Sequence, residues 1–290
     1  MSGGHQETHE RVSVLQSVLS HTLLIGAVVF ALYPILWVLS LAFSAGESPE
    51  LGPIPVPDQF SMEHVEAVAL RKSDDGTWIF ALQLGNSLLI SIATALFAVA
   101  IATPAAYALS RFTFVGKKLT LGAMLATQMF PGVAAAIPLY LLMDALGLID
   151  TRSGLVLVYA TSAVPFAIFQ LRSAFDAIPK DLEEAAMVDG ATRFGAFRRV
   201  VLPTVRPSLA ITFLFAFMTA WNEFILAATF LNREENYTLP VVLQRYVGEH
   251  AAQWGHFAAG AILVSVPVMA LFYWLQRNLV GGLTAGGVKG

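Results

Sequence analysis

One carboxylate lies inside an otherwise uncharged hydrophobic stretch of the chain. Glu223 is the only Asp, Glu, Lys or Arg between Pro207 and Asn232. Ionisable side chains in apolar spans usually face a bundle interior or a water-filled cavity. The neighbouring Trp221 and Asn222 offer an aromatic face and an amide that could stack on and hydrogen-bond a polar ligand. A structural polar link to a neighbouring helix explains the same residues, so both interpretations stay open.

Gln128 is a second candidate for the lining of a pathway. It lies near Pro131 and Pro138 in another charge-free stretch. Proline leaves backbone carbonyls without their usual helical partner, and these groups need another partner within a membrane. Pore lining and helix packing both satisfy that need.

Signatures of catalysis are absent from the sequence. It has no G-x-x-x-x-G-K-[ST] phosphate loop, no G-x-S-x-G elbow and no H-E-x-x-H pair. There is no cysteine, and the six histidines show no paired spacing on one expected helix, so no metal site is predicted. We therefore expect a non-enzymatic chain that binds no cofactor of its own.

Residues 181–203, DLEEAAMVDGATRFGAFRRVVLP, are charged and alanine-rich in a chain that is 56% hydrophobic. Asp181 and Glu184 have the spacing of a capping box, with Asp in the place of Ser or Thr. Gly190 fits a helix end that requires positive φ. The helical period places four side chains on one face. They are Leu182, Ala185, Ala186 and Asp189.

A second short helix is expected after this one, capped by Thr192 and ended by Pro203. Small residues on the first helix let another backbone approach closely. The segment is therefore suited to dock into a groove of a partner. A structured loop that packs only under its own bundle is the alternative.

Six charge-free or nearly charge-free stretches are long enough to cross a bilayer. The apolar core, about 30 Å thick, needs about 20 apolar residues in a helix, because each backbone amide must be bonded within the segment. Charged residues make up only 13% of the chain, against about a quarter in an ordinary globular domain. The fold class expected is all-α, a polytopic membrane protein. Its six transmembrane helices are predicted at 21–43, 84–110, 118–143, 153–173, 207–231 and 257–280.

The basic residues indicate how these spans are oriented. With both termini in the cytoplasm, that side holds 12 of the 17 Lys and Arg residues and the far side holds the other 5. Cytoplasmic loops carry such an excess. The division expected is a cytoplasmic leader at 1–20, a transmembrane domain at 21–281 and a cytoplasmic tail at 282–290. Within the domain we expect outer segments at 44–83, with a short helix near Ser61 and Glu63, and at 232–256, and a cytoplasmic segment at 174–206.

The segment 184–203 resembles the EAA motif of ABC importer permeases. That motif reads E-A-A, three residues, G, nine residues, a branched aliphatic residue, one residue, then L-P. The matching positions are Glu184, Ala185, Ala186, Gly190, Val200, Leu202 and Pro203, with Val for the usual Ile. TQMFPGVAAAIPLYLLMDALGLIDT, AWNEFILA, NYTLPVVLQRYVG and GLTAGGVKG resemble carbohydrate-uptake permeases, most closely the smaller permease subunit of maltose/maltodextrin importers. The resemblance covers residues 20–290.

The resemblance implies the ABC importer type I permease fold, with a coupling helix seated in a cleft of a cytoplasmic ATPase. By position, that helix contains Glu183, Glu184, Ala185, Ala186, Asp189 and Gly190. The implied partners are a second related permease subunit, two cytoplasmic ABC ATPases that bind ATP and Mg, and an extracytoplasmic sugar-binding protein facing residues 232–256. Closure of the ATPases on ATP would tip the bundle from inward-open to outward-open.

Maltose or maltodextrins are the first substrates the resemblance implies, then trehalose or another α-glucoside, then other oligosaccharides. In maltose-type systems the sugar site is expected mainly on the larger permease, so a pore-facing Glu223 would gate rather than bind. A secondary transporter is the rival class, but no internal repeat or midplane ion pair supports it. Membrane lipid surrounds such a chain, and no nucleic acid is expected, since basic and aromatic residues are not interleaved.

Overall fold

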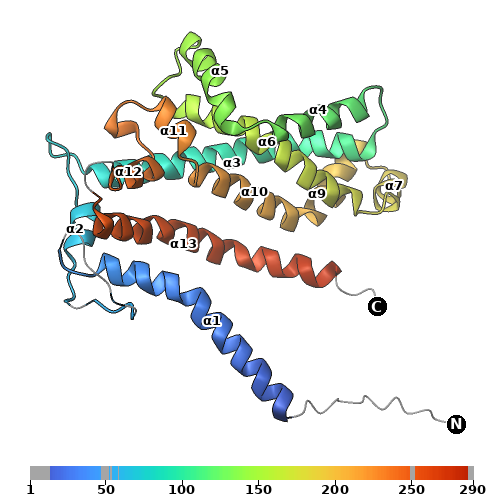
Figure 1. The fold of residues 1–290 in the computed structure, drawn as a ribbon. Coiled ribbons are helices and arrows are strands. Elements are labelled where there is room, and N and C mark those ends of the chain that lie inside the picture. Colours follow the sequence, from blue (N-terminus) through green and yellow to red (C-terminus); the bar gives the residue numbers. More distant parts are fainter. Residues whose placement is uncertain (1–13, 47–51, 53, 58, 249–251, 287–290) are drawn as a thin grey trace.

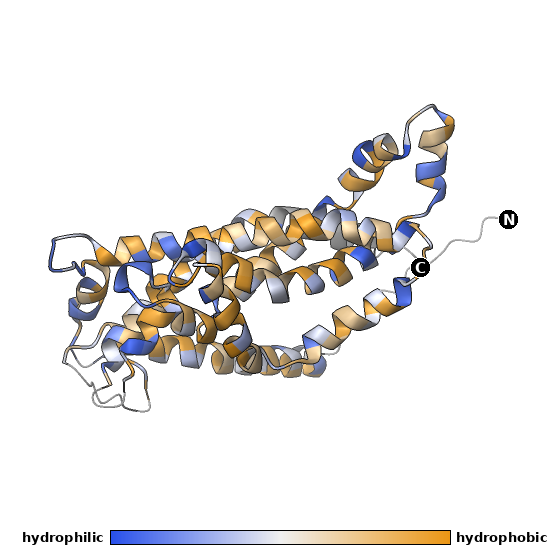
Figure 2. Ribbon diagram, turned by 90° about the horizontal axis from the view of Figure 1, so that it is seen from above, coloured by the Kyte–Doolittle hydropathy of each residue, from blue (hydrophilic) through white to orange (hydrophobic). Residues whose placement is uncertain are grey.

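The structure is a computed structural model that describes residues 14–46, 52, 54–57, 59–248 and 252–286. Over these residues the chain forms helices and turns, and its only extended pairing is three isolated antiparallel bridges. Hydrophilic residues gather toward the two ends of the molecule, and hydrophobic residues line the helices between them (Figure 2). The expected all-α membrane fold is confirmed.

Four helices run side by side and form the body of the bundle (Figure 1). They are α3 (Ile79–Arg111), α6 (Arg152–Asp176), α10 (Arg206–Trp221) and α13 (Trp254–Gly286). α3 packs along α6 and α10, and α10 also packs on α13. Small residues on α3 allow this close approach. Ala95, Ala98, Ala102 and Ala106 are fully buried.

Helix α1 (Val14–Ala42) packs on α13 and then diverges from the bundle (Figure 1). Its apolar side chains are exposed for most of its length, and Phe30 reaches 83% exposure. A helix that is apolar and exposed all round needs lipid or another protein chain against it. α1 begins inside the expected leader, and residues 1–13 and 287–290 of the expected leader and tail lie outside the described residues.

Four of the described helices, α1, α3, α6 and α13, are each long and apolar enough to cross a membrane alone. The helix expected at 118–143 is interrupted rather than continuous. It consists of α4 (Lys117–Met129) and α5 (Gly132–Ala145), which meet at 101°. Pro131 has no amide hydrogen and holds Phe130 in an extended conformation, which ends α4.

The span expected at 207–231 is also interrupted. α10 ends at Trp221 and a short helix, α11 (Ile225–Phe230), follows a break at 222–224. Before α10 come α7 (Asp181–Val188), α8 (Arg193–Ala196), a π-helical turn η1 (Phe197–Val201) and α9 (Leu202–Thr204). Pro203 was expected to end a helix, but it lies in the first turn of α9, where no amide donor is needed. The turn of the chain comes later, with a 71° bend between 193–204 and 206–221.

The two ends of the bundle carry different short elements (Figure 1). We call the end with α7 the inner end. The opposite, outer end carries α2 (Glu63–Ala69), the 3-10 turn η2 (Glu234–Asn236) and α12 (Leu239–Arg245). The short helix expected near Ser61 and Glu63 is therefore confirmed, and the Ser61 hydroxyl accepts a hydrogen bond from the Glu63 amide at 3.2 Å.

Candidate functional site

The end of α7 has the backbone geometry expected from its sequence. Gly190 has φ +91°. Its amide donates to the Met187 carbonyl at 3.1 Å, and the Ala191 amide donates to the Ala186 carbonyl at 3.0 Å. This pair of bonds is the Schellman motif, which satisfies carbonyls that a helix end would leave free. The following helix is capped as expected, because the Thr192 hydroxyl accepts from the Gly195 amide at 3.1 Å.

The start of α7 differs from the expected capping box. Lys180 is the N-cap residue and makes no side-chain cap, and Asp181 is already helical. The amides of Glu183 and Glu184 instead donate to the Lys180 carbonyl at 2.9 and 3.1 Å. Asp181 and Glu184 still place negative charge in the first turn, where the helix dipole favours it.

The six residues assigned to a coupling helix divide into an exposed set and one inward side chain. Glu184, Ala185, Asp189 and Gly190 are exposed, as is Leu182 beside them, and Ala186 is half-buried. A pocket of about 280 Å³ lies beside this face, between α7 and the turn that follows, and Arg199 and Val200 line its far side. α7 therefore presents Ala185 and Gly190 to the surroundings at the inner end, together with the larger exposed side chains of Leu182 and Val188.

Glu183 points the other way, into the bundle, and is only 6% exposed. Its carboxylate forms an ion pair with the Arg111 guanidinium and accepts a hydrogen bond from the Tyr107 hydroxyl at 2.8 Å. Arg111 also donates to the Ile178 carbonyl at 3.1 Å. Tyr107 and Arg111 belong to α3, so Glu183 attaches α7 to a transmembrane helix. We call Tyr107, Arg111 and Glu183 the inner cluster.

The residues assigned to a translocation pathway have different surroundings. Trp221 is 2% exposed and stacks on Phe217, with ring centroids 5.4 Å apart, so its indole is part of the core. Asn222 is exposed in the break after α10. Gln128, from α4, donates to the Ser162 carbonyl of α6 at 3.0 Å. Gln128 also lines a cavity of about 820 Å³ beside the α4–α5 break, together with Phe130.

Glu223 lies in the break between α10 and α11. Its carboxylate oxygens accept hydrogen bonds from the amides of Leu226 at 2.8 Å and Ala227 at 3.0 Å. The buried Tyr159 of α6 lies next to the same carboxylate. Glu223 thus satisfies free donors at the start of α11, which supports the structural interpretation of this residue.

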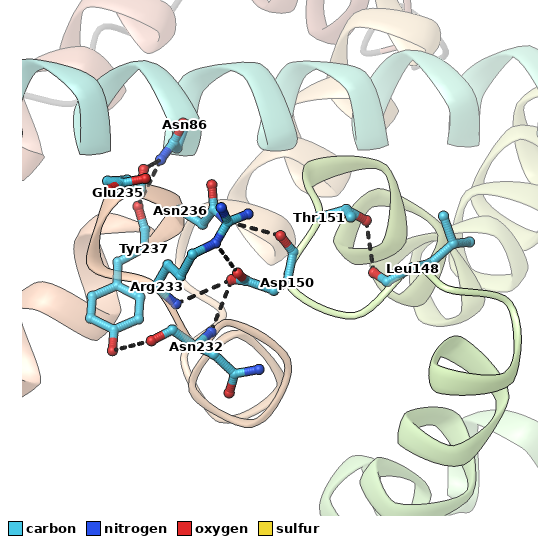
Figure 3. A network of polar contacts seen from close by, with 9 residues as sticks. All are labelled: Asn86, Leu148, Asp150, Thr151, Asn232, Arg233, Glu235, Asn236 and Tyr237. Carbon is cyan, nitrogen blue, oxygen red and sulfur yellow. Dashed lines mark hydrogen bonds and ion pairs between the residues drawn. The ribbon is translucent and has the colours of Figure 1, made fainter.

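A polar network joins the outer-end elements (Figure 3). Asp150 lies in the turn before α6, and its carboxylate accepts from the Asn232 amide at 3.0 Å and from the Arg233 Nε at 2.6 Å. Asn86 of α3 donates to the carbonyls of Glu235 at 2.7 Å and Tyr237 at 3.2 Å. The first part of the expected outer segment is therefore held against both α3 and the α5–α6 turn.

Two further α3 side chains complete these contacts. The Gln83 amide donates to the Glu234 carbonyl at 3.1 Å, and the Ser87 hydroxyl accepts from the Leu239 amide at 2.8 Å. Gln83, Asn86 and Ser87 are each at most 2% exposed. We call these three side chains, with the backbone of 234–239 that they bind, the outer cluster.

Asp150 is held ionised by this network. Its partial burial would raise the pKa, but hydrogen bonds from Arg233 and from the Asn232 amide outweigh that effect and lower the pKa from 3.8 to about 2. The same contact raises the pKa of the Arg233 guanidinium. Asp150 also has φ 57°, a left-handed conformation that Asp tolerates better than most residues.

Sequence reasoning missed the inner and outer clusters on α3. The available signal was the presence of Gln83, Asn86 and Ser87 in a stretch without charge, because polar groups in a membrane helix require partners. Across the described residues, no three His, Asp or Glu side chains converge as metal ligands would.

Comparisons with known proteins agree with this architecture. Residues 98–284 match the family described as the binding-protein-dependent transport system inner membrane component. The trehalose transport system permease protein SugB of Mycobacterium tuberculosis (strain CDC 1551 / Oshkosh) is 36% identical over 271 residues, 93% of this chain and 95% of SugB. The maltose/maltodextrin transport system permease protein MalG of Yersinia pestis is 37% identical over 285 residues, 93% of each chain.

A solved structure gives the same result for the fold. A chain of a bacterial ABC transporter involved in the import of alginate, an acidic polysaccharide, superposes with a TM-score of 0.73 at 25% identity. The match covers 95% of this chain and 99% of that chain. The expected ABC importer permease fold is thereby confirmed, and this multi-pass membrane protein belongs to the family of binding-protein-dependent transport system inner membrane components.

Proposed function

We propose that this chain is a permease subunit of an ATP-driven importer that carries maltose, maltodextrins or a related α-glucoside across the inner membrane. Its similarity to a maltose/maltodextrin permease and to a trehalose permease supports sugars of this class. Trehalose is the first alternative cargo. Self-sufficient secondary transport is not favoured, because the family belongs to transport systems that depend on a binding protein.

In this proposal the permease hydrolyses nothing and binds no cofactor. ATP and Mg bind two cytoplasmic ATPase subunits, a second related permease completes the pathway, and an extracytoplasmic protein delivers the sugar. Both termini lie in the cytoplasm, so the inner end faces the ATPases. Lipid and the second permease cover the exposed apolar surface of α1.

The observation that carries the proposal is the geometry of α7. This short helix is fixed at its end by the Schellman motif, exposes Ala185 and Gly190, and is attached to the bundle through Glu183. A contact can shift an equilibrium only if its strength differs between two states. A stiff helix seated in an ATPase cleft transmits the closure of that cleft to the bundle.

The test measures ATP hydrolysis by the purified assembly in lipid, with and without the binding protein loaded with maltose or trehalose. Gly190→Ala forces a side chain into positive φ, which costs about 1–2 kcal/mol. Gly116→Ala is the matched control, since its φ is +92° and both positions have open space for a Cβ. Ala185→Leu enlarges the exposed face of α7 without backbone strain.

We expect Gly190→Ala and Ala185→Leu to abolish most sugar-stimulated hydrolysis, and Gly116→Ala to retain it. The sugar that stimulates more identifies the cargo. Equal stimulation in all variants would contradict the coupling role of α7. It would support the alternative, in which this segment only packs under its own bundle.

A further inference from the structure

We infer that α3 joins the outer segment 234–239 to α7 as one mechanical unit, through the polar cluster at each of its ends. The outer state of the permease and the position of its coupling helix then change together. This inference rests on the proposed function, because it assigns to α3 the connection between the binding-protein side and the ATPase side.

The inner cluster is a strong attachment because it is buried and ionic. The side chains of Arg111 and Glu183 are only 5% and 8% exposed. Little water screens their attraction, and the Tyr107 hydroxyl binds the second carboxylate oxygen. These contacts join residues 72 and 76 positions apart in the sequence. A displacement of α7 therefore reaches α3 directly through these side-chain contacts, and not along the chain that connects the two helices.

Aromatic packing surrounds the inner cluster and adds stiffness. The Tyr107 ring lies 4.5 Å from the Phe197 ring of η1 and 5.8 Å from the Phe175 ring of α6. The Arg193 guanidinium lies over the Phe112 ring at 5.2 Å. Two residues of the segment that follows α7, Arg193 and Phe197, thus contact the inner end of α3.

The outer cluster attaches a different segment to the same helix. Buried amides of Gln83 and Asn86 bind three backbone carbonyls, and Ser87 binds the first amide of α12. Because these hydrogen bonds are made to the backbone, they hold the segment in place independently of its side chains. Any partner that moves 234–239 must therefore move α3 or break buried hydrogen bonds, which leaves costly unpaired groups.

The helix between the two clusters is long and well packed. α3 has 33 residues, and the 25 residue steps from Asn86 to Arg111 correspond to about 37 Å at 1.5 Å per residue. Its buried alanines pack against α6 and α10 along this length. Coupling between sites is reciprocal, so a change at either cluster has to appear at the other.

The test compares variants that cut one cluster with a control on the same helix. Glu183→Gln combined with Tyr107→Phe weakens the inner cluster. Asn86→Leu weakens the outer cluster, because it removes two of its four hydrogen bonds and keeps the number of side-chain heavy atoms. Thr103→Val is the control, because the Thr103 hydroxyl bonds only its own helix, at the Val99 carbonyl. Should a variant not assemble with the ATPases, Tyr107→Phe and Ser87→Ala are milder single changes that replace it.

The measured quantity is the ratio of ATP hydrolysis with and without binding protein loaded with maltose or, in a parallel arm, trehalose. We expect the variants of each cluster to lower this ratio by about fivefold or more, which is the low end of typical allosteric couplings. The Thr103→Val variant should have the same ratio as the wild type. The variant with both clusters cut should be no worse than the worse single cut, because the two contacts act in series.

The outcomes separate this inference from the proposed function. Stimulation of the wild type by neither sugar overturns both. If the wild type is stimulated and the cluster variants have the same stimulation ratio as Thr103→Val, only the role of α3 is overturned. Losses that multiply in the double-cut variant also overturn it, since they indicate two independent connections.

Discussion

Replacement of Asp150 by Asn should loosen the segment 232–237 without disturbing its backbone. Asn tolerates the left-handed conformation at this position as well as Asp does, so the change removes only the charge. The carboxylate binds the Asn232 amide and the Arg233 side chain. The perturbation therefore isolates one electrostatic contact of the outer end.

The size of the effect follows from the pKa of Asp150. A shift from 3.8 to about 2 corresponds to roughly 2.5 kcal/mol at 1.36 kcal/mol per unit. Arg233 is 66% exposed, so water screens the pair and the net contribution falls to about 1 kcal/mol. Opening of the segment should then be about fivefold more frequent in the variant.

Hydrogen exchange of the peptide covering 232–237, in lipid at neutral pH, measures this opening. We expect about fivefold faster exchange in Asp150→Asn, and no change in Asp144→Asn, which removes an equal charge from exposed α5. The folded pKa lies below the unfolded value. Ionised Asp150 thus stabilises the segment above pH 4, and this contribution is lost as the pH falls toward 2.

Two results would refute this reasoning. One is equal exchange in the wild type and Asp150→Asn at neutral pH. The other is a difference between them that persists undiminished at pH 2, where Asp150 is about half protonated in the folded state and most of its stabilising contribution is lost.

Two further predictions concern other parts of the bundle. Glu223→Ala should lower the midpoint of thermal unfolding by about 2–4 °C, as loss of a helix cap of about 1 kcal/mol does, and should leave the sugar concentration for half-maximal ATPase stimulation unchanged. A rise in that concentration would show instead that Glu223 contacts the sugar. Gly255→Ala places a Cβ in steric conflict with Nε2 of buried His64 and should destabilise by about 1–3 kcal/mol. Gly85→Ala, which has open space, should not, and equal melting of the two variants would contradict the close packing of α2 on α13.

Features with local causes were predictable from the sequence. Gly190 and Thr192 behave as expected, because a glycine after a helix and a hydroxyl before one act through neighbouring backbone groups. The cap expected at Asp181 failed because the helix begins one residue earlier. The first residue of α7 depends on the direction in which the preceding helix and Pro179 lead the chain into it. A short sequence pattern does not contain this information.

Features that depend on distant partners were not predictable. Glu183 was assigned to a coupling helix by position, but its inward direction depends on Arg111. Hydropathy located the stretch 118–143 correctly and missed its bend, because the length of an apolar stretch carries no information about direction. Pro131 was noted for its free carbonyls, and its effect on the helix axis required the structure.

The 101° break between α4 and α5 brings opposite helix poles together. The carboxyl end of α4 carries a partial charge of about −0.5, and the amino end of α5 carries about +0.5. Both poles lie beside the cavity that Gln128 and Phe130 line, and their fields largely cancel at a distance. The two helix ends therefore give this cavity wall little net preference for anions or for cations.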